Sequence, residues 1–278
     1  MLSELELRNI FFEVLEKDFD SRTIEQWLRI YDEDKDWDKS ISQPHRHEII
    51  ESDLLRIKNG EPIQYVVGKA YFYDRLFNVN PDVLIPRPET EELVSLVLKN
   101  HKRENQLSVL DVGTGSGCIA VVLKDRLNLA TVYALDKSEE AIQVAKSNAG
   151  KYDVDVSFLE LDFLNEGNWD LLPVVDIIVS NPPYIQCEEK RMMTDSVLKY
   201  EPISALIPDH PDPLVFYRRL AAIGLKLFKG KGRIYVEINE FLGPETFRVF
   251  INAGYEAQLH QDIQGKNRMI RASIDTLK

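Results

Sequence analysis

The spacing of apolar residues predicts helices in the first part of the chain. Up to residue 60, apolar positions recur every three or four residues, which places them on one face of a helix. The residues that form these stripes are Leu7, Phe11, Val14, Leu15, Ile24, Trp27, Leu28, Tyr31, Ile50, Leu54 and Ile57. Gly60 follows the third stripe and is a residue type that commonly ends helices. We therefore expect a small bundle of short helices.

The next segment predicts a β-hairpin followed by a stiff connection. Between Gln64 and Val79, short apolar runs are interrupted by Gly68 and Asp74, as in two strands joined by turns. Three prolines between residues 81 and 88 then exclude a helix or a central strand. A further helix is expected to begin near Glu89.

From residue 107 onward, strand patterns and helix patterns alternate. Seven short runs are expected to be strands, at residues 108–112, 131–136, 154–159, 176–180, 233–238, 255–260 and 269–274. Such alternation predicts an α/β fold with a doubly wound, mostly parallel sheet. No helix pattern separates the last two strands, so one of them should run antiparallel. The patterns divide the chain into a helical domain, a hairpin linker and a larger domain, at residues 1–62, 63–82 and 83–278.

Composition and charge narrow the function classes. The chain has 34 Lys and Arg against 46 Asp and Glu, and a net charge of −12 opposes binding to phosphate backbones unless a local basic patch exists. Two cysteines, Cys118 and Cys187, exclude a disulfide framework and a cysteine-based zinc site. No apolar run approaches a membrane span, and the N-terminus lacks a secretory pattern. We expect a cytoplasmic protein.

Half of the excess negative charge lies in the first 60 residues, which hold 15 acidic and 9 basic residues. A solvated surface explains this charge, and so does an acidic dock for a basic partner.

A glycine-rich turn follows the first predicted strand of the sheet. Residues 111–117 read Asp-Val-Gly-Thr-Gly-Ser-Gly and lead into a helix, whose N-terminal N–H groups suit an anion. The spacing matches neither the dinucleotide fingerprint nor a P-loop. It favours a ligand with a carboxylate, such as the amino-acid end of S-adenosylmethionine, and a plain strand–helix turn is the alternative. The candidate contacts are Gly113, Thr114, Gly115, Ser116 and Gly117.

Acidic residues end or follow the next two predicted strands. Asp136 ends one of them, at a position from which a carboxylate accepts hydrogen bonds from both ribose hydroxyls. Asp162 and Phe163 follow the other, where a polar group and a ring could hold adenine. Trp169 is a second candidate for that ring, and ordinary core packing is the alternative for Phe163.

The sequence Asn-Pro-Pro-Tyr at residues 181–184 is the most specific motif in the chain. Its prolines stiffen a loop beyond the carboxyl edge of the sheet, and Pro183 has no N–H to offer. The Asn181 side-chain oxygen and the Pro182 carbonyl can accept both N–H bonds of a planar NH₂ group, while Tyr184 stacks on it. Such fixed acceptors stabilise the positive charge that grows on nitrogen during methyl transfer. A proline-rich turn without chemistry is the alternative.

With these motifs, the sequence resembles the release-factor glutamine N5-methyltransferases, the HemK/PrmC family. The resemblance covers nearly the whole chain and includes Ile-Pro-Arg-Pro-Glu-Thr-Glu at 85–91, the glycine loop, Asn-Pro-Pro-Tyr, and Tyr-Glu-Pro at 200–202. It implies a Rossmann-like class I S-adenosylmethionine-dependent methyltransferase domain with a seven-stranded sheet, preceded by a helical substrate-docking domain and a hairpin linker. Departures occur at Phe163, where Trp is frequent, at Asn239, where Gly is common, and at Asp212-Pro213 in place of Asp-Gly.

The resemblance also implies the reaction. The donor would be S-adenosyl-L-methionine, with S-adenosyl-L-homocysteine as product and no metal. The acceptor would be the side-chain nitrogen of the glutamine in the Gly-Gly-Gln motif of class-one peptide-chain release factors, which act in translation termination. The family's cofactor contacts fall on residues 113–117, Asp136, Phe163 and Asn181, and its glutamine contacts fall on residues 181–184.

Two other functions stay open at this point. A DNA or RNA amino-methyltransferase could use the same loop on a flipped base, although no Lys/Arg-rich stretch supports it. A non-catalytic binding module could retain the fold. We expect a monomer without membrane attachment or stable nucleic-acid binding. A release factor's Gly-Gly-Gln loop should have basic surroundings, so acids between Asp32 and Asp38 are expected to attract it. Glu237 receives no role, and packing is the preferred interpretation of Cys118 over an acidified thiol.

Overall fold

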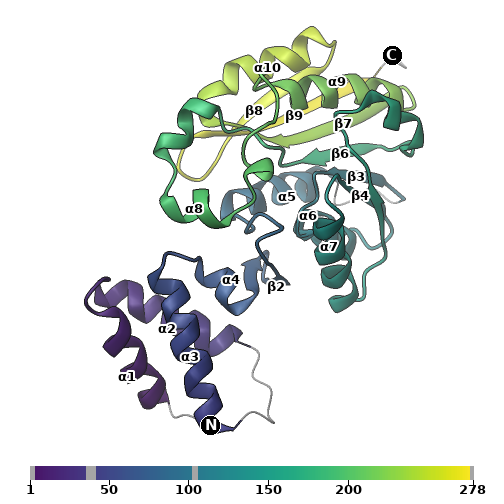
Figure 1. Ribbon diagram of the computed structural model, residues 1–278. Helices are drawn as coiled ribbons and strands as arrows, with labels where there is room; N and C mark the ends of the chain where they lie inside the picture. The colour runs from purple at the N-terminus through teal and green to yellow at the C-terminus, as the bar shows by residue number, and fades with distance from the viewer. Residues whose placement is uncertain (1–3, 36–41, 102–105, 276–278) are drawn as a thin grey trace.

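The computed structural model describes residues 4–35, 42–101 and 106–275. A group of N-terminal helices lies beside a larger part built on a twisted sheet (Figure 1). These helices are α1 (Glu4–Leu15), α2 (Ser21–Asp34), α3 (Gln43–Lys58) and α4 (Ile63–Val67). Their apolar faces form one cluster, whose buried members are Leu7, Phe11, Leu15, Ile24, Leu28, Tyr31, Ile50, Leu54, Ile57, Ile63, Val66 and Val67. The predicted helical bundle is confirmed.

The hairpin is shorter than the sequence pattern predicts. Within the predicted hairpin segment, β1 (Lys69–Phe72) pairs with β2 (Arg75–Asn78) in antiparallel fashion, and α4 occupies residues 63–67. The prediction of a strand from residue 64 onward was wrong. Pro62 stands at the N-cap of α4, and Gly68 ends the helix with a φ of 73°, a left-handed conformation that glycine adopts readily. The short helix instead buries its apolar side in the N-terminal cluster.

A seven-stranded sheet forms the larger part, as predicted. Its strands are β3 (Ser108–Val112), β4 (Thr131–Asp136), β5 (Val156–Glu160), β6 (Ile177–Ser180), β7 (Lys231–Glu237), β8 (Glu256–Gln261) and β9 (Asn267–Asp275). They lie in the order β5-β4-β3-β6-β7-β9-β8. Strand β9 runs antiparallel to both of its neighbours, β7 and β8, which confirms that one of the last two strands is antiparallel.

Helices cover both faces of the sheet (Figure 1). On one face lie α5 (Pro88–His101), α6 (Cys118–Arg126) and α7 (Glu139–Lys151), and on the other lie α9 (Val215–Leu227) and α10 (Gly243–Asn252). The side chains of strand β6 alternate between the two faces of the sheet. Ile177 and Val179 pack into the core on one face, and Ile178 packs into the core on the other. A strand buried on both faces therefore appears in the sequence as a continuous apolar run.

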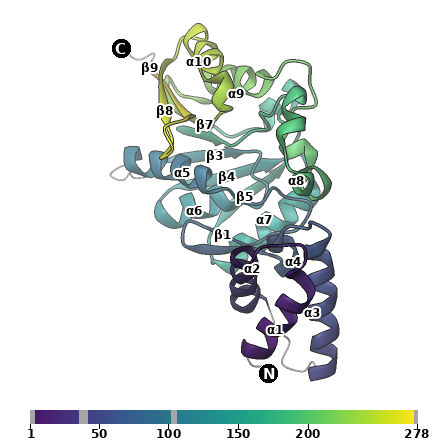
Figure 2. The same cartoon turned by 90° about the vertical axis from the view of Figure 1, so that its left-hand side faces the viewer.

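A short helix connects the sheet to the N-terminal bundle. Both views place α8 (Asp195–Tyr200) beside the end of α3 (Figures 1 and 2). Ser196 Oγ donates to Gly60 O at 2.6 Å, and Tyr200 OH donates to Asn59 O at 3.1 Å. Short 3₁₀ segments complete the connections, at Glu166–Leu171, Cys187–Met192, Ile203–Ala205 and Glu240–Leu242.

We expect Gly117→Ala to lower the free energy of unfolding by about 2–4 kcal/mol. Gly117 has a φ of 78°, and a Cβ there would lie 2.9 Å from the Cβ of Ala145 on α7. Urea unfolding measures the change. Gly150→Ala is the matched control, because Gly150 lies in α7 with open space around it, and it should stabilise the protein by up to about 1 kcal/mol. Equal losses in both variants would contradict the close helix approach.

Candidate active site

Two adjoining pockets lie at the carboxyl ends of the parallel strands. Each has a volume of about 250 Å³. The first pocket is lined by the glycine loop and the ends of β4 and β6, and the second is lined by the Asn-Pro-Pro-Tyr loop and α8. The residues that line both are Leu84, Arg87, Asn181 and Ala205. Ligands in the two pockets would therefore meet beside Asn181.

The glycine loop forms one wall of the first pocket. Gly113 and Gly115 have φ values of 73° and 52°, and a Cβ at either position would meet nothing within 4 Å. These two glycines adopt a left-handed backbone conformation that other residues rarely adopt, and the lack of a side chain leaves space in front of the backbone. Thr114 and Ser116 also line the pocket. Gly117 does not line it, because it packs against α7 instead.

Asp136 lies at the end of β4 and faces the first pocket. Its Oδ2 accepts a hydrogen bond from Gly115 N at 2.9 Å, and its Oδ1 accepts one from Ser138 N at 3.1 Å. A carboxylate has about four acceptor positions, so these two bonds leave capacity for hydroxyl donors of a ligand. The backbone bonds also fix the carboxylate against the glycine loop.

Phe163, and not Trp169, lines the first pocket. Trp169 lies behind it and donates from Nε1 to Phe163 O at 2.9 Å. Phe216 on α9 also lines the pocket, and its ring is nearly parallel to that of Phe163 at an angle of 13°. Sequence analysis assigned no role to Phe216. Asp162 lines the pocket beside these rings and remains exposed.

The side chain of Asn181 has a defined orientation. Its Nδ2 donates to Thr90 Oγ1 at 3.0 Å, and Thr90 Oγ1 donates to Glu237 Oε2 at 2.7 Å. Because the amide nitrogen is bonded to Thr90, the amide oxygen Oδ1 is left as an acceptor on a residue that lines both pockets. Pro183 lines only the first pocket, and Pro182 lines only the second.

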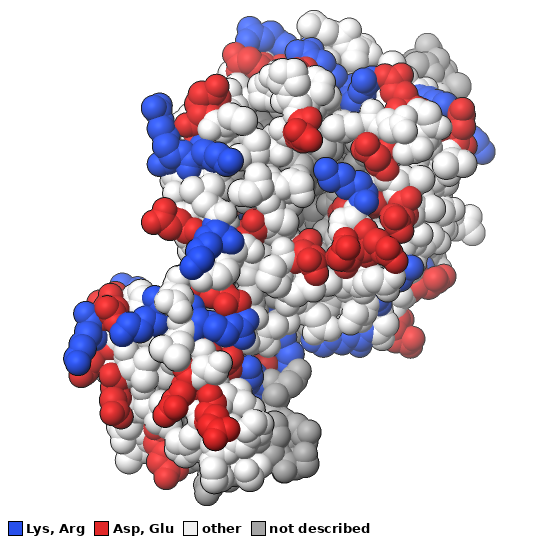
Figure 3. All heavy atoms as spheres, in the orientation of Figure 1, with Lys and Arg blue, Asp and Glu red and all other residues white. Residues whose placement is uncertain are grey.

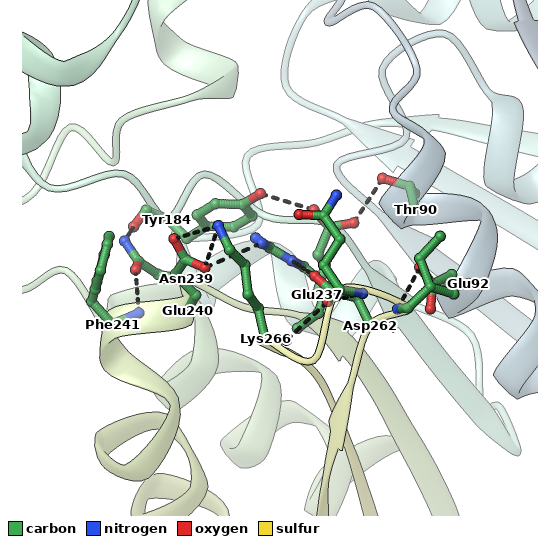
Figure 4. Close-up of polar contacts among 12 residues, drawn as sticks. Thr90, Glu92, Tyr184, Glu237, Asn239, Glu240, Phe241, Asp262 and Lys266 are labelled. Atoms are coloured by element: carbon green, nitrogen blue, oxygen red, sulfur yellow. Dashed lines mark hydrogen bonds and ion pairs between the residues drawn. The ribbon is translucent and has the colours of Figure 1, made fainter.

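Tyr184 forms part of the second pocket and is held at its hydroxyl end. The hydroxyl donates to Glu237 Oε1 at 2.8 Å, so Glu237 bridges Tyr184 and Thr90 (Figure 4). Burial and the neighbouring Glu237 carboxylate raise the pKa of Tyr184 well above its usual value. The hydroxyl therefore stays protonated and does not act as a base. Asn239 holds the same loop, because its Nδ2 donates to Tyr184 O at 3.1 Å.

The Ile-Pro-Arg-Pro segment covers both pockets and is held by Glu201. Arg87 Nη2 lies 2.5 Å from Glu201 Oε1, and Ile85 N donates to Glu201 Oε2 at 3.3 Å. The Glu201 side chain is 1% exposed. Sequence reasoning assigned no role to Arg87, Glu201 or Thr90, although it quoted the segments that contain them. The available signal was that the segments 85–91 and 200–202, which contain these residues, carried the resemblance to the methyltransferase family.

Two other sequence interpretations now have a structural answer. Burial raises the pKa of the Cys118 thiol to about 12, so the thiol is not acidified at the start of α6. Asp34 is 2% exposed, and burial raises its pKa, so it is no part of an exposed acidic dock. Asp32 and Glu33 are exposed, whereas Asp36 and Asp38 lie outside the described residues. Figure 3 shows acidic and basic side chains interspersed on the visible face of the N-terminal helices.

We expect Asp111→Asn to change how stability depends on pH. Burial at the end of β3 raises the pKa of Asp111 from its ordinary 3.8 to about 7. The folded state then binds more protons than the unfolded state, so this group's contribution is full below about pH 4 and is lost as the pH rises through about 7. The wild-type unfolding free energy should therefore fall more steeply than the variant's over this range, by up to about 1.4 kcal/mol per pH unit. Urea unfolding between pH 4 and 8 tests this, and parallel curves would contradict it.

Among the residues that the structure describes, no three His, Cys, Asp or Glu side chains gather closely enough to hold a metal ion. No helix in these parts of the chain has the length and apolar character needed to cross a membrane.

Comparisons with known proteins agree with this geometry. Residues 90–201 match the model of the methyltransferase small domain. A crystal structure of a methyltransferase from Pyrococcus furiosus superposes with a TM-score of 0.52, at 16% identity, over 83% of this chain and 98% of that one. This likeness supports the class I methyltransferase fold.

Relatives of known name are much more similar in sequence. A release factor glutamine methyltransferase from Flavobacterium psychrophilum is 41% identical over 228 residues, which cover 81% of this chain and 79% of that protein. Another, from Bacteroides thetaiotaomicron, is 43% identical over 225 residues, which cover 81% of this chain and 80% of that protein. With this identity over most of both lengths, the chain belongs to the release factor glutamine methyltransferase family.

Proposed function

We propose that this protein transfers a methyl group from S-adenosyl-L-methionine to the side-chain amide nitrogen of the glutamine in the Gly-Gly-Gln motif of class-one release factors. Family membership supports the reaction. One structural observation carries it: two pockets share Asn181 in their linings, and its Nδ2 is bonded to Thr90, which leaves the amide oxygen as the free acceptor. A planar NH₂ group in the second pocket would find its acceptor there.

The first pocket has the groups that S-adenosylmethionine requires. The backbone of the glycine loop leaves room for the amino-acid end of the cofactor, and Asp136 has free acceptor capacity for the ribose hydroxyls. Phe163 and Phe216 provide an apolar wall for adenine, with Asp162 at its edge. The cofactor, when bound, supplies a methyl group on a positively charged sulfur. We assign cofactor binding to Gly113, Thr114, Gly115, Ser116, Asp136, Asp162, Phe163 and Asn181.

The second pocket orients the glutamine amide. Asn181 Oδ1 and the Pro182 carbonyl each accept a hydrogen bond from one of its two N–H groups. The Tyr184 ring covers the planar group and excludes water. The nitrogen lone pair of an amide is delocalised, so rate depends on holding the nitrogen in line and on stabilising the charge that develops on it. The two acceptor dipoles do this without an ionised base. The additional N–H proton, made acidic by that charge, leaves to water afterwards.

The direct test is methylation of a purified release factor with labelled methyl donor, followed by mass mapping. We expect one methyl group on the Gln of Gly-Gly-Gln and none on a factor in which that Gln is replaced by Glu. A parallel reaction with DNA or RNA in place of the release factor, and with the same labelled methyl donor, tests the nucleic-acid alternative. The net charge of −12 opposes that alternative. Methyl transfer to a base, with none to the factor, would overturn the proposal.

We also propose that residues 1–62 dock the substrate, that residues 63–82 connect the two domains, and that residues 83–278 catalyse methyl transfer. We further propose that the protein is a cytoplasmic monomer that does not bind nucleic acid stably. The exposed acids Asp32 and Glu33 allow the docking part to be tested. Asp32→Lys with Glu33→Lys should slow methylation of the intact factor and leave a short Gly-Gly-Gln peptide unaffected. Equal effects on both substrates would contradict docking by these charges. Asp34 is unsuitable for reversal, because it is buried.

A further inference from the structure

A chain of hydrogen bonds centred on the buried Glu237 lies behind the Asn-Pro-Pro-Tyr loop. Glu237, at the end of β7, is 1% exposed and accepts from Thr90 Oγ1 at 2.7 Å and from Tyr184 OH at 2.8 Å (Figure 4). Thr90, on α5, is also buried and accepts from Asn181 Nδ2 at 3.0 Å. Glu237 lines neither pocket, so it reaches the junction only through these neighbours.

The direction of each bond follows from the chemistry of Glu237. A carboxylate only accepts hydrogen bonds, and each oxygen of Glu237 faces one hydroxyl group. Thr90 has a single hydroxyl hydrogen and gives it to Glu237, so it offers only a lone pair to Asn181. A lone pair pairs with the amide NH₂ and not with the amide oxygen. Burial raises the pKa of Glu237, while the two hydroxyls and the positive charge of Arg268 favour its ionised form.

We propose that Glu237 and Thr90 are positioning residues that set the flip of the Asn181 amide, so that Oδ1 and not Nδ2 faces the substrate nitrogen. This inference rests on the proposed function. The reversed amide would place an NH₂ group against the NH₂ group of glutamine, two donors with no acceptor between them. Because the same carboxylate holds the Tyr184 hydroxyl, one buried side chain fixes both the acceptor and the aromatic wall of the second pocket.

Substitutions at Thr90 test the chain with little change of shape. Thr90→Val removes the lone pair that holds Nδ2, and we expect kcat for release-factor methylation to fall about 100-fold. Thr90→Ser retains the hydroxyl and should stay within about threefold of wild type. Thr246→Val is the matched control, because Thr246 is also buried and its hydroxyl donates only to the backbone, to Leu242 O at 2.8 Å. The Kd of S-adenosylmethionine, measured by calorimetry, should change less than threefold in all three.

Glu237→Gln tests the direction of the bonds. A glutamine at this position can donate to Thr90, which frees the Thr90 hydrogen for Asn181 Oδ1 and favours the reversed amide. We expect a loss in kcat of about 100-fold with little change in KM. In the double variant with Thr90→Val, the loss should not exceed the larger single loss, because both changes act through the Asn181 amide. A role in folding alone would instead lower Tm and leave the kcat of the folded fraction unchanged.

The outcomes separate this inference from the proposed function. If the wild-type protein transfers no methyl group to a release factor, the proposed function is wrong. If the wild type is active but Thr90→Val keeps its kcat, or the two losses multiply, the positioning role is wrong. If Glu237→Gln does not fold, the comparison of Thr90→Val with Thr90→Ser decides, since equal activity in the two would overturn the inference.

Discussion

Replacement of Asn181 by alanine is expected to lower kcat for release-factor methylation by about 100- to 1000-fold. The variant loses the Oδ1 acceptor at the junction of the pockets and keeps the glycine loop, Asp136 and the aromatic wall of the first pocket. The Kd of S-adenosylmethionine should therefore rise by less than about tenfold. Single-turnover kinetics and calorimetry give the two quantities separately.

A matched asparagine controls for general effects of the Asn181 change. Asn100 on α5 also donates from Nδ2, to Leu96 O at 2.7 Å, but it lines neither pocket. Asn100→Ala should therefore retain kcat. Unchanged turnover in Asn181→Ala would refute the acceptor mechanism. Full cofactor binding without turnover in the wild type would favour the non-catalytic binding module that the sequence left open.

The second large effect is expected for cofactor affinity in Asp136→Ala. The variant loses the carboxylate that would accept from two ribose hydroxyls, and hydrogen bonds to a charged group contribute about 1.5–3 kcal/mol each. We expect the Kd of S-adenosylmethionine to rise at least about 100-fold. The loss also removes the acceptor of Gly115 N, so the glycine loop becomes less ordered. Calorimetric titration measures the affinity.

Asp155→Ala is the control for the Asp136 change. Asp155 is an exposed acid just before β5, at the edge of the sheet opposite the pockets, so its loss removes the same charge without touching the site. Its Kd should equal that of wild type. If Asp136→Ala also binds the cofactor normally, the assignment of the ribose position is wrong.

Much of the sheet could be predicted because its signals are local. The strands at 108–112 and 131–136 have the predicted limits, since each is a short apolar run ended by a turn residue. Parallel strands bring their carboxyl ends to one edge, and therefore residues 113–117, Asp136, Asp162 and Asn181 were expected to lie together. The structure places all of them except Gly117 around one pocket.

Other features depend on partners distant in the sequence. Thr90, Asn181 and Glu237 come from three separate elements, and no spacing rule indicates that a threonine and a buried glutamate orient the asparagine amide. The choice of Phe163 over Trp169 as the pocket wall also required the fold, because both residues are apolar and follow the same strand. The sequence named Phe163 first and Trp169 as the second candidate, and pattern alone did not decide between them.

The amino-acid sequence by itself determined the strand–helix alternation, the glycine turn and the stiff Asn-Pro-Pro-Tyr loop, because periodicity and backbone restriction act over a few neighbouring residues. Only the tertiary structure decided that residues 63–67 are helical, that Asp34 is buried, and that Glu237 stands behind the Asn181 amide. These outcomes depend on which surfaces lose water and which polar groups then need partners. Both are properties of the whole packed chain.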